Sequence, residues 1–347
     1  MTKIPMSEII NKTISCAMHD SDKVICFGLG VTDPKGVFGT TLDLEKKYGS
    51  NRVFDVPASE NALTGFAIGA SLNSSIPILT HQRLDFALLS MDQIINSAAK
   101  WLYMFGGQFN VPITIRMIIG RGWGQGPTHS QNLHSVFSHI PGLKVVSAST
   151  PDDAADLLYS SIFDPNPVIF LEHRWLHNSI GKFPSKLKKN ELGKCKILKK
   201  GKDITLISLS YMTLECIEAA KILNKFKIDA EIVDLRTTSP LDQTTIINSL
   251  KKTRRALIAD TSNSFCGISS TVASIIYQNI SNLKNKIEIV SLPFCPEPTS
   301  HQLVKYFYND RYTIVNKVLK TFKINKKVKK DKSIKPDVPG DWFKGPF

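Results

Sequence analysis

The stretch Val111-Pro112-Ile113-Thr114-Ile115-Arg116-Met117-Ile118-Ile119 decides the fold class of this 347-residue chain. It is a nearly continuous apolar run of strand length, which is typical of strands buried on both faces in parallel sheets. A loop with four glycines, residues 120–131, follows it. Loops at the carboxyl ends of parallel strands often carry function. The stretch therefore predicts an α/β protein with a parallel sheet.

Strand and helix patterns alternate on both sides of this run and predict two doubly wound α/β domains. The first is expected at residues 1–185 and a smaller second one at residues 204–322. A basic linker, residues 186–203, should join them, and a basic and aromatic tail, residues 323–347, should follow. Within the first domain we expect one long amphipathic helix over residues 85–104.

Composition limits the classes of partner. The chain has 44 lysines and arginines against 30 acidic residues, a net charge of +14. Much of this excess falls in the linker and the tail, and no nucleic-acid motif accompanies it, so we expect no nucleic-acid partner. No apolar run reaches the roughly 18–20 residues that cross a membrane. The six cysteines form no CxxC pair, which argues against disulfides and zinc and favours a reducing cytoplasm.

One carboxylate stands out in the run Val53-Phe-Asp-Val-Pro-Ala-Ser-Glu60-Asn-Ala-Leu63. Glu60 lies at the start of a helix pattern rich in small residues, against which another backbone or a flat cofactor could lie. Our hypothesis is that Glu60 acts on a bound cofactor. The alternative is a helix-start carboxylate that interacts only with the helix dipole.

Histidines supply two further candidates. His129 lies in the glycine-rich loop after the buried strand, where an imidazole can transfer protons near neutral pH. His173 and His177 are four residues apart, a spacing that suits metal ligands on a helix. They follow a strand pattern instead, so we favour a structural or partner-facing role for them.

Several motifs along the chain together carry a resemblance to a known family. They are Pro57-Ala-Ser-Glu60, Asp85-Phe86, Met91-Asp-Gln-Ile-Ile-Asn-Ser-Ala-Ala-Lys100, His129-Ser-Gln131 and His139-Ile-Pro-Gly-Leu-Lys-Val-Val146. This series resembles the beta subunit of thiamine-diphosphate-dependent 2-oxoacid dehydrogenases. Asp234-Leu-Arg-Thr237 with Pro240-Leu-Asp242 resembles the transketolase C-terminal domain. The resemblance covers residues 4–322 and implies a transketolase-like pyrimidine-binding domain followed by that smaller domain.

The resemblance assigns roles to particular residues. It implies that Glu60 hydrogen-bonds a ring nitrogen of the cofactor's aminopyrimidine and that Phe86 packs against this ring. Gln82 is expected at the cofactor as well. His129 matches the histidine that faces the substrate. Without the resemblance, a phenylalanine such as Phe86 at a helix start would be read as core filling.

A monovalent cation site, for K+, is another feature that the resemblance implies, built largely from backbone carbonyls. The matching positions are Ile113, Ser161, Ile162, Asp164 and Asn166. Only Asp164 offers a charge.

The sequence also departs from the family pattern near the expected substrate. Thr128 stands where the family usually has glutamine, and the polar run Thr80-His81-Gln82-Arg83 replaces more apolar or acidic residues. Together with Arg121, these departures suggest a pocket edged by His81, Arg83 and Arg121 that suits an anionic or polyhydroxylated substrate.

The chain contains no Gly-Asp-Gly motif, by which the family holds the diphosphate through Mg2+. We therefore expect an alpha-type partner to bring these groups, in an α2β2 assembly. The expected activity is decarboxylation of a 2-oxoacid with transfer of the acyl group to a lipoyl carrier, so a lipoyl acyltransferase is a further possible partner. The alternatives are a split transketolase-like or decarboxylase subunit acting on a polar, sugar-derived substrate, and a non-catalytic scaffold, which intact Glu60, Phe86 and His129 disfavour.

Overall fold

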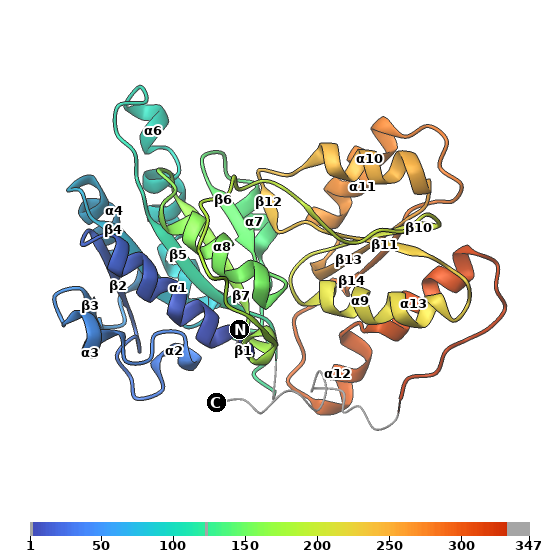
Figure 1. The fold of residues 1–347 in the computed structure, drawn as a ribbon, viewed down its shortest axis with the longest axis horizontal. Coiled ribbons are helices and arrows are strands. Elements are labelled where there is room, and N and C mark those ends of the chain that lie inside the picture. The colour runs from blue at the N-terminus through green and yellow to red at the C-terminus, as the bar shows by residue number, and fades with distance from the viewer. Residues whose placement is uncertain (1–2, 122–123, 332–347) are drawn as a thin grey trace.

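The structure is a computed structural model that describes residues 3–121 and 124–331 (Figure 1). The aromatic residues of the expected tail, Trp342, Phe343 and Phe347, lie outside the described residues. None of the described helices is long and apolar enough to span a membrane. The six cysteines are all unpaired.

Six strands from the first half of the chain and one from the second half form a seven-stranded sheet in the order β12-β6-β7-β5-β4-β2-β3. Its strands are β2 (Val24–Gly28), β3 (Val53–Phe54), β4 (Ile76–His81), β5 (Thr114–Ile119), β6 (Lys144–Ser147), β7 (Val168–His173) and β12 (Thr237–Ser239). All of them except β12 pair in parallel. The parallel sheet that the 111–119 run predicts is therefore confirmed.

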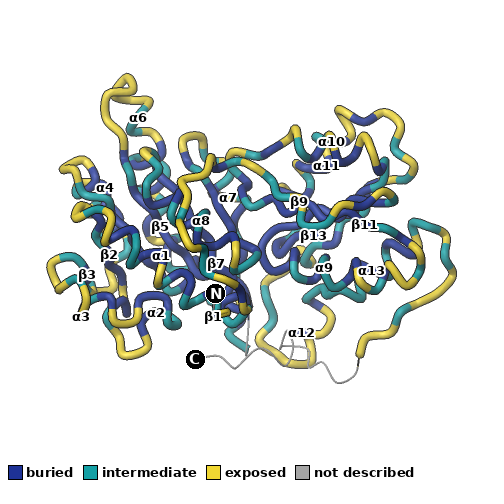
Figure 2. Tube along the Cα trace, viewed as in Figure 1, coloured by how far each residue is buried: buried dark blue, intermediate teal, exposed yellow. Residues whose placement is uncertain are grey.

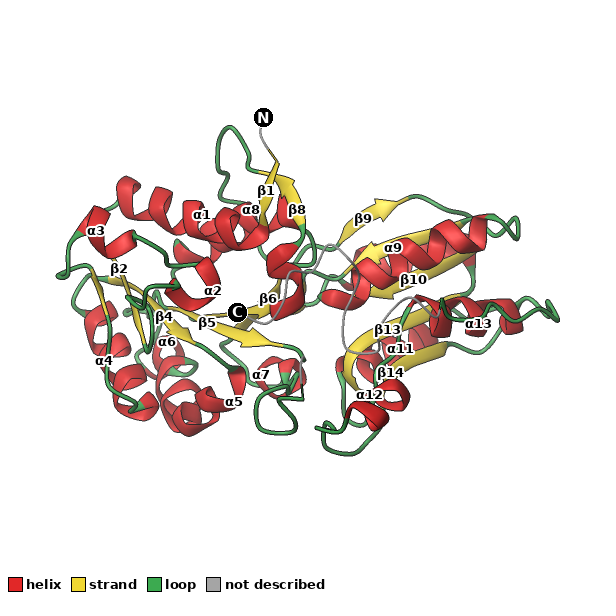
Figure 3. Ribbon diagram, turned by 90° about the horizontal axis from the view of Figure 1, so that it is seen from below, coloured by secondary structure: helices red, strands yellow, loops and turns green. Residues whose placement is uncertain are grey.

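Helices cover both faces of this sheet (Figure 3). On one face α1 (Met6–Asp20) packs against α8 (Pro151–Ile162), with the short helices α2 (Gly36–Gly39) and α3 (Leu44–Tyr48) nearby. On the other face lie α4 (Glu60–Leu72) and α7 (His134–Ser138). The strands β1 (Lys3–Pro5) and β8 (Ile180–Lys182) form a separate two-stranded antiparallel sheet.

The expected helix at residues 85–104 is instead a series of short pieces. They are α5 (Leu84–Ala87), a 3-10 turn (Leu88–Ser90), a π-helical segment (Gln93–Ala98) and α6 (Trp101–Met104). In the π segment the Ala99 amide donates to the carbonyl of Ile94, five residues back. A wider turn shifts the following side chains around the axis without changing the apolar spacing much, so the sequence pattern alone does not reveal it.

The second half forms a five-stranded sheet in the order β14-β13-β10-β11-β9. Its strands are β9 (Lys196–Lys199), β10 (Ile204–Ser208), β11 (Ala230–Asp234), β13 (Ala256–Asn263) and β14 (Glu288–Leu292). The helices α10 (Gln243–Thr253) and α11 (Ile268–Asn279) cover one face, and α9 (Tyr211–Asn224) and α13 (Arg311–Thr321) cover the other. The helix α12 (His301–Phe307) follows β14 in the chain.

Two strands depart from the expected domain organisation. β9 belongs to the stretch expected to be a linker, yet it pairs antiparallel with β11 in the second sheet. β12 lies in the second half of the sequence but pairs with β6 in the first sheet. The domain limits stay a prediction, but residues 186–203 contribute a strand and are more than a linker.

A fully buried ion pair connects the strands at the centre of the first sheet. Arg116 on β5 binds Glu172 on β7 through two hydrogen bonds, Nε to Oε1 at 2.6 Å and Nη2 to Oε2 at 3.0 Å. Arg116 also donates to the hydroxyl of Thr80 on β4 at 3.2 Å, and His177 Nε2 lies 3.0 Å from Glu172 Oε2. Burial alone would raise the pKa of Glu172, but Arg116 and His177 outweigh it and lower this pKa to about 2.

This cluster predicts an acid-sensitive fold. Glu172→Gln should lower the free energy of unfolding by about 3–5 kcal/mol at neutral pH, because it leaves the Arg116 charge buried without its counter-charge. In the unchanged protein the pKa of Glu172 is depressed from 4.5 to about 2. Its stabilisation is therefore complete above the unfolded-state pKa and is lost as the pH falls from 4.5 toward 2. Urea unfolding at several pH values measures both effects.

Asp43→Asn is the control, because it breaks the exposed ion pair between Asp43 and Lys46 and should leave stability unchanged. An equal, small effect of both variants would contradict the prediction.

Candidate cofactor site

A pocket forms where the carboxyl ends of β2 and β4 meet the amino end of α4. We name it the Glu60 pocket. It is lined by Gly28, Leu29, Pro57, Ala58, Glu60, Leu63, Leu79, Thr80, His81, Gln82 and Phe86. Four residues that the sequence nominated, Glu60, His81, Gln82 and Phe86, therefore share one pocket, at the edge of the sheet where α/β proteins bind ligands.

Glu60 is the first residue of α4 and is half-buried. Its carboxylate makes no hydrogen bond or ion pair with any residue that the structure describes, and so it remains available to a ligand. The loop before it is held by Asp55, whose Oδ1 accepts from the Gly30 amide at 2.9 Å. At the pocket floor β2 and β4 approach so closely that a Cβ on Gly28 would lie 2.2 Å from the Thr80 carbonyl oxygen. Only glycine allows this approach.

Phe86 and His129 meet at the rim of the pocket. Their ring centroids are 5.4 Å apart and the rings are nearly perpendicular, at 88°. The side chain of Gln131 fixes the His129 loop to α5 by donating to Asp85 Oδ1 at 2.8 Å. His129 Nδ1 lies 3.1 Å from the hydroxyl of Thr128, the residue that departs from the family pattern. The structure thus brings His129 next to the pocket that contains Glu60.

The second domain supports this loop from behind. A Cβ on Gly126 would lie 2.4 Å from Thr299 Oγ1, so the loop packs directly against the second domain. Close by, His134 Nε2 on α7 lies 3.0 Å from Asp260 Oδ1 on β13, and both side chains are buried. Burial alone would raise the pKa of Asp260, but His134 and two backbone amides lower it. The sequence gives no local signal for this pair, because its members are far apart in the chain.

Arg83 and Arg121, which the sequence predicted at the edge of a substrate pocket, lie in different surroundings. Arg83 is buried and donates to the Gly120 carbonyl at 3.3 Å and to the side chain of Gln125. The Arg121 guanidinium lies between two rings, 4.0 Å from the Trp175 centroid and 3.9 Å from that of Tyr308. Neither arginine lines the Glu60 pocket, so their role toward a substrate stays a prediction.

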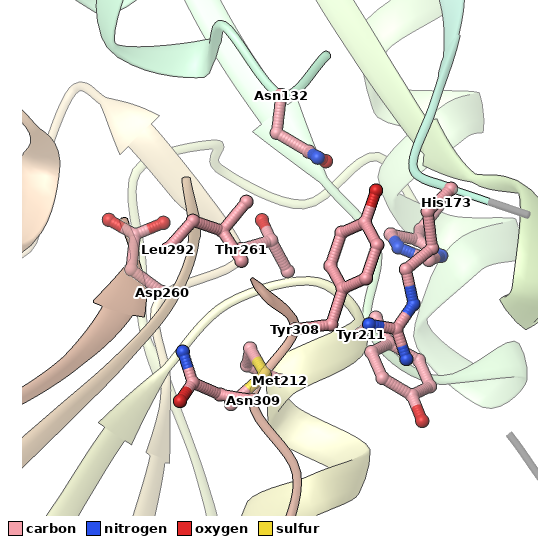
Figure 4. Close-up of a pocket in the computed structure, with 10 residues that line it drawn as sticks. Asn132, His173, Tyr211, Met212, Asp260, Thr261, Leu292, Tyr308 and Asn309 are labelled. Atoms are coloured by element: carbon pink, nitrogen blue, oxygen red, sulfur yellow. The ribbon is translucent and has the colours of Figure 1, made fainter. Parts of the chain in front are cut away.

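Arg121 instead lines a small cavity between the two domains. Figure 4 shows Tyr308 beside Tyr211 and His173 on one side of this cavity, and Asp260 with Thr261 on the other. The His173 ring stacks on Tyr211 with centroids 5.0 Å apart. His177 bonds Glu172 in the core, so both histidines of the 173–177 pair have structural contacts. Among the described residues no group of three His, Cys, Asp or Glu side chains could hold a metal ion.

The positions matched to a K+ site already have partners within the chain. Asp164 Oδ2 lies 2.5 Å from the Lys144 ammonium, so the one charged ligand is neutralised. The Ser161 carbonyl accepts from the Thr114 hydroxyl, and the Ile113 carbonyl accepts from the Val168 amide. Ile162 is buried, and the backbone N–H of Asn166 donates a hydrogen bond to Asp164 Oδ1. This arrangement does not favour a bound potassium ion, and the cation site stays a prediction.

The residues of the Glu60 pocket have the chemistry that the aminopyrimidine end of thiamine diphosphate requires. It combines a carboxylate that has no partner among the described residues, the phenyl ring of Phe86, and the apolar side chains of Leu63 and Leu79. Nothing comparable is present for the charged end, since the described residues include neither the Gly-Asp-Gly motif nor a cluster of metal ligands.

Comparison with known proteins gives matches along most of the chain. The family "Transketolase, pyrimidine binding domain" matches residues 2–178, and "Transketolase, C-terminal domain" matches residues 193–314. The chain is 38% identical over 332 residues to the acetoin:2,6-dichlorophenolindophenol oxidoreductase subunit beta of Cupriavidus necator, covering 92% of this chain and 98% of that protein. It is 36% identical over 319 residues to the pyruvate dehydrogenase E1 component subunit beta of Rickettsia bellii, with the same coverage.

Among solved structures, a split gene transketolase described as an inactive beta4 tetramer superposes with a TM-score of 0.75. The alignment covers 93% of this chain and 99% of that one at 20% sequence identity. This likeness confirms the expected α/β fold of two transketolase-type domains.

Proposed function

This chain belongs to the family of the beta subunits of thiamine-diphosphate-dependent 2-oxoacid dehydrogenases, as its motifs predicted, and we propose that it acts as such a subunit. The proposed reaction is decarboxylation of a 2-oxoacid and transfer of the acyl group to a lipoyl carrier. The observation that carries the proposal is the Glu60 pocket, where a carboxylate without a described partner and an aromatic ring lie together.

The pocket residues have distinct tasks in this reaction. Glu60 would hold a proton opposite a ring nitrogen of the aminopyrimidine, and Phe86 would pack against the ring face. Gln82, which also lines the pocket, would contact the same cofactor. His129 would donate or accept a proton near the substrate carbonyl, since it lies against Phe86 at the rim. When bound, the cofactor itself supplies the nucleophilic carbon and stabilises the charge that decarboxylation produces.

This chemistry predicts a sharp effect of changing Glu60. Glu60→Gln removes the proton-holding carboxylate while keeping the side chain's size, so kcat should fall at least about a hundredfold. Binding of thiamine diphosphate to the assembled enzyme, followed by calorimetry, should change far less. Glu45→Gln, an acidic residue of α3 outside the pocket, is the matched control. Activity that survives Glu60→Gln would refute the assigned role.

We infer that an alpha-type partner brings the diphosphate and Mg2+ ligands and completes the site in an α2β2 assembly, with a lipoyl acyltransferase as the downstream partner. The exposed side of α4 supports this inference. A Cβ on Gly69 would meet nothing within 4 Å, and Phe66 is 52% exposed beside it. A second backbone can therefore lie against the helix that begins with Glu60. We also place the enzyme in the cytoplasm, in keeping with its unpaired cysteines.

The isolated chain should therefore not retain thiamine diphosphate. Calorimetry of the purified chain with cofactor and Mg2+ should give no binding, whereas the chain co-purified with its alpha-type partner should bind. The expected difference is large, because the chain grips only the pyrimidine end. Tight binding by the chain alone would contradict the shared site.

An exposed apolar arm, residues 101–109, is a second candidate contact for the partner. It extends from the first domain at α6, and its surface is open to solvent (Figures 1 and 2). Tyr103 is 91% exposed, Met104 54%, and Phe109 54%. A cluster of this kind on a monomer marks an interaction site.

The arm predicts a defect in assembly. The double variant Tyr103→Ser, Met104→Ser should weaken the complex with the alpha-type partner at least about tenfold, because exposed aromatic anchors dominate interface energies. Analytical ultracentrifugation of the mixed subunits measures this. Tyr306→Ser on α12, which removes another highly exposed tyrosine, should have no effect. Equal affinities for both variants would exclude the arm from the interface.

A second candidate function shares the same site. The polar side chain of His81 in the Glu60 pocket favours a split transketolase-like subunit that acts on a polar, sugar-derived substrate. The two functions differ in substrate, not in the roles of Glu60 and Phe86.

A further inference from the structure

His81 is a polar side chain of the Glu60 pocket with a buried nitrogen that lacks a hydrogen-bond partner among the described residues. It is the last residue of β4 and is 5% exposed. Its Nε2 atom is buried and has no hydrogen-bond partner among the described residues. Buried polar atoms in folded proteins almost always have a partner, so an atom of this kind at the wall of a pocket points to a ligand.

The other polar side chains of the pocket already have a contact or a task. The Thr80 hydroxyl accepts from Arg116 at 3.2 Å. The Gln82 amide lies over the Gly30 turn, where a Cβ on Gly30 would come within 2.1 Å of its Nε2. In the proposed function both Glu60 and Gln82 are assigned to the cofactor. The remaining wall is apolar, with Leu63, Leu79 and Phe86. His81 is therefore the side chain left to recognise a polar group on the substrate.

The protonation of His81 defines what it can recognise. Burial lowers the pKa of His81 to about 4, so the imidazole is neutral near pH 7. A neutral imidazole has one N–H donor and one acceptor nitrogen, and it suits a hydroxyl group, which can both donate and accept. Arg83, two residues further along the chain, is also buried. It donates hydrogen bonds to neutral groups, the Gly120 carbonyl and the side-chain carbonyl of Gln125.

We propose that His81 is a specificity-determining residue that hydrogen-bonds a hydroxyl group next to the reacting carbonyl of the substrate. The substrate class is then a hydroxylated 2-oxo compound in preference to an alkyl 2-oxoacid of the same size. This proposal rests on the proposed function, because it assumes that the substrate reacts in the Glu60 pocket.

Two probes of nearly equal shape test the proposal. 3-Hydroxypyruvate and 2-oxobutyrate differ in a hydroxyl against a methyl group. With the complete enzyme, the ratio of kcat/KM for 3-hydroxypyruvate to that for 2-oxobutyrate should exceed one. His81→Phe should lower this ratio at least about tenfold, because a site built to bond a hydroxyl discriminates strongly against its absence. His81→Gln, which keeps a donor and an acceptor, should restore part of the ratio.

A role of His81 in packing alone would change both substrates equally and leave the ratio unmoved, and that result would overturn the proposal. His139→Phe, at an exposed histidine that does not line the pocket, is the control and should not alter the ratio.

A second measurement does not depend on turnover. In spectra of the complex with 15N-labelled histidine, 3-hydroxypyruvate should shift the His81 Nε2 resonance and 2-oxobutyrate should not. If thiamine diphosphate alone causes the shift, or neither probe does, the proposal is wrong. If the resonance shifts with 3-hydroxypyruvate but the complex turns over no 2-oxoacid, the proposed reaction fails while the assignment of His81 stands.

Discussion

A charged guanidinium buried in the middle of a parallel sheet constrains much of this structure. Arg116 is completely buried, and the carboxylate of Glu172 on the adjacent strand neutralises it in a two-point contact. The same guanidinium reaches the Thr80 hydroxyl on the strand at its other side. Breaking such a pair exposes the full desolvation penalty of the remaining charge, so β4, β5 and β7 are held in one arrangement. The Glu60 pocket is built on the end of that arrangement, since Thr80 and His81 close β4.

In the proposed function, the chain supplies one half of a binding site. The chain offers a carboxylate, an aromatic ring and apolar walls to the flat end of a cofactor, and its described residues offer no cluster for the charged end. An anionic diphosphate needs a metal or cationic ligands, which another subunit must then supply. A site shared between two subunits requires exposed surface where the second subunit can bind. The open face of α4 and the exposed apolar arm provide such surface. In the proposed function, catalysis and assembly would both depend on α4, whose first residue is Glu60.

Specificity has a separate physical origin. In the proposed function, Glu60 and Phe86 would contact a cofactor that is the same for every substrate, so they would carry no information about the substrate. A buried, neutral histidine can distinguish substrates. A substrate that leaves its nitrogen without a hydrogen-bond partner binds at a cost in free energy, whereas a substrate that forms the hydrogen bond does not. The His129 loop adds a second polar group at the rim, and the second domain supports this loop through its contact at Thr299.

The sequence by itself determined the fold class and the family, and it nominated the candidate residues of the site. The apolar run at 111–119 is nearly continuous, as in strands buried on both faces of a parallel sheet. Glu60, Phe86 and His129 lie in motifs that can be recognised without coordinates. Only the tertiary structure decided the contacts between residues that are far apart in the chain. It separated Arg121 from the Glu60 pocket and paired Asp164 with Lys144 and His134 with Asp260. It also placed β9, from the expected linker, in the second sheet and β12, from the expected second domain, in the first sheet. These contacts join residues far apart in the chain, and they leave no periodic or local pattern, because only packing decides which buried charge or strand edge meets which.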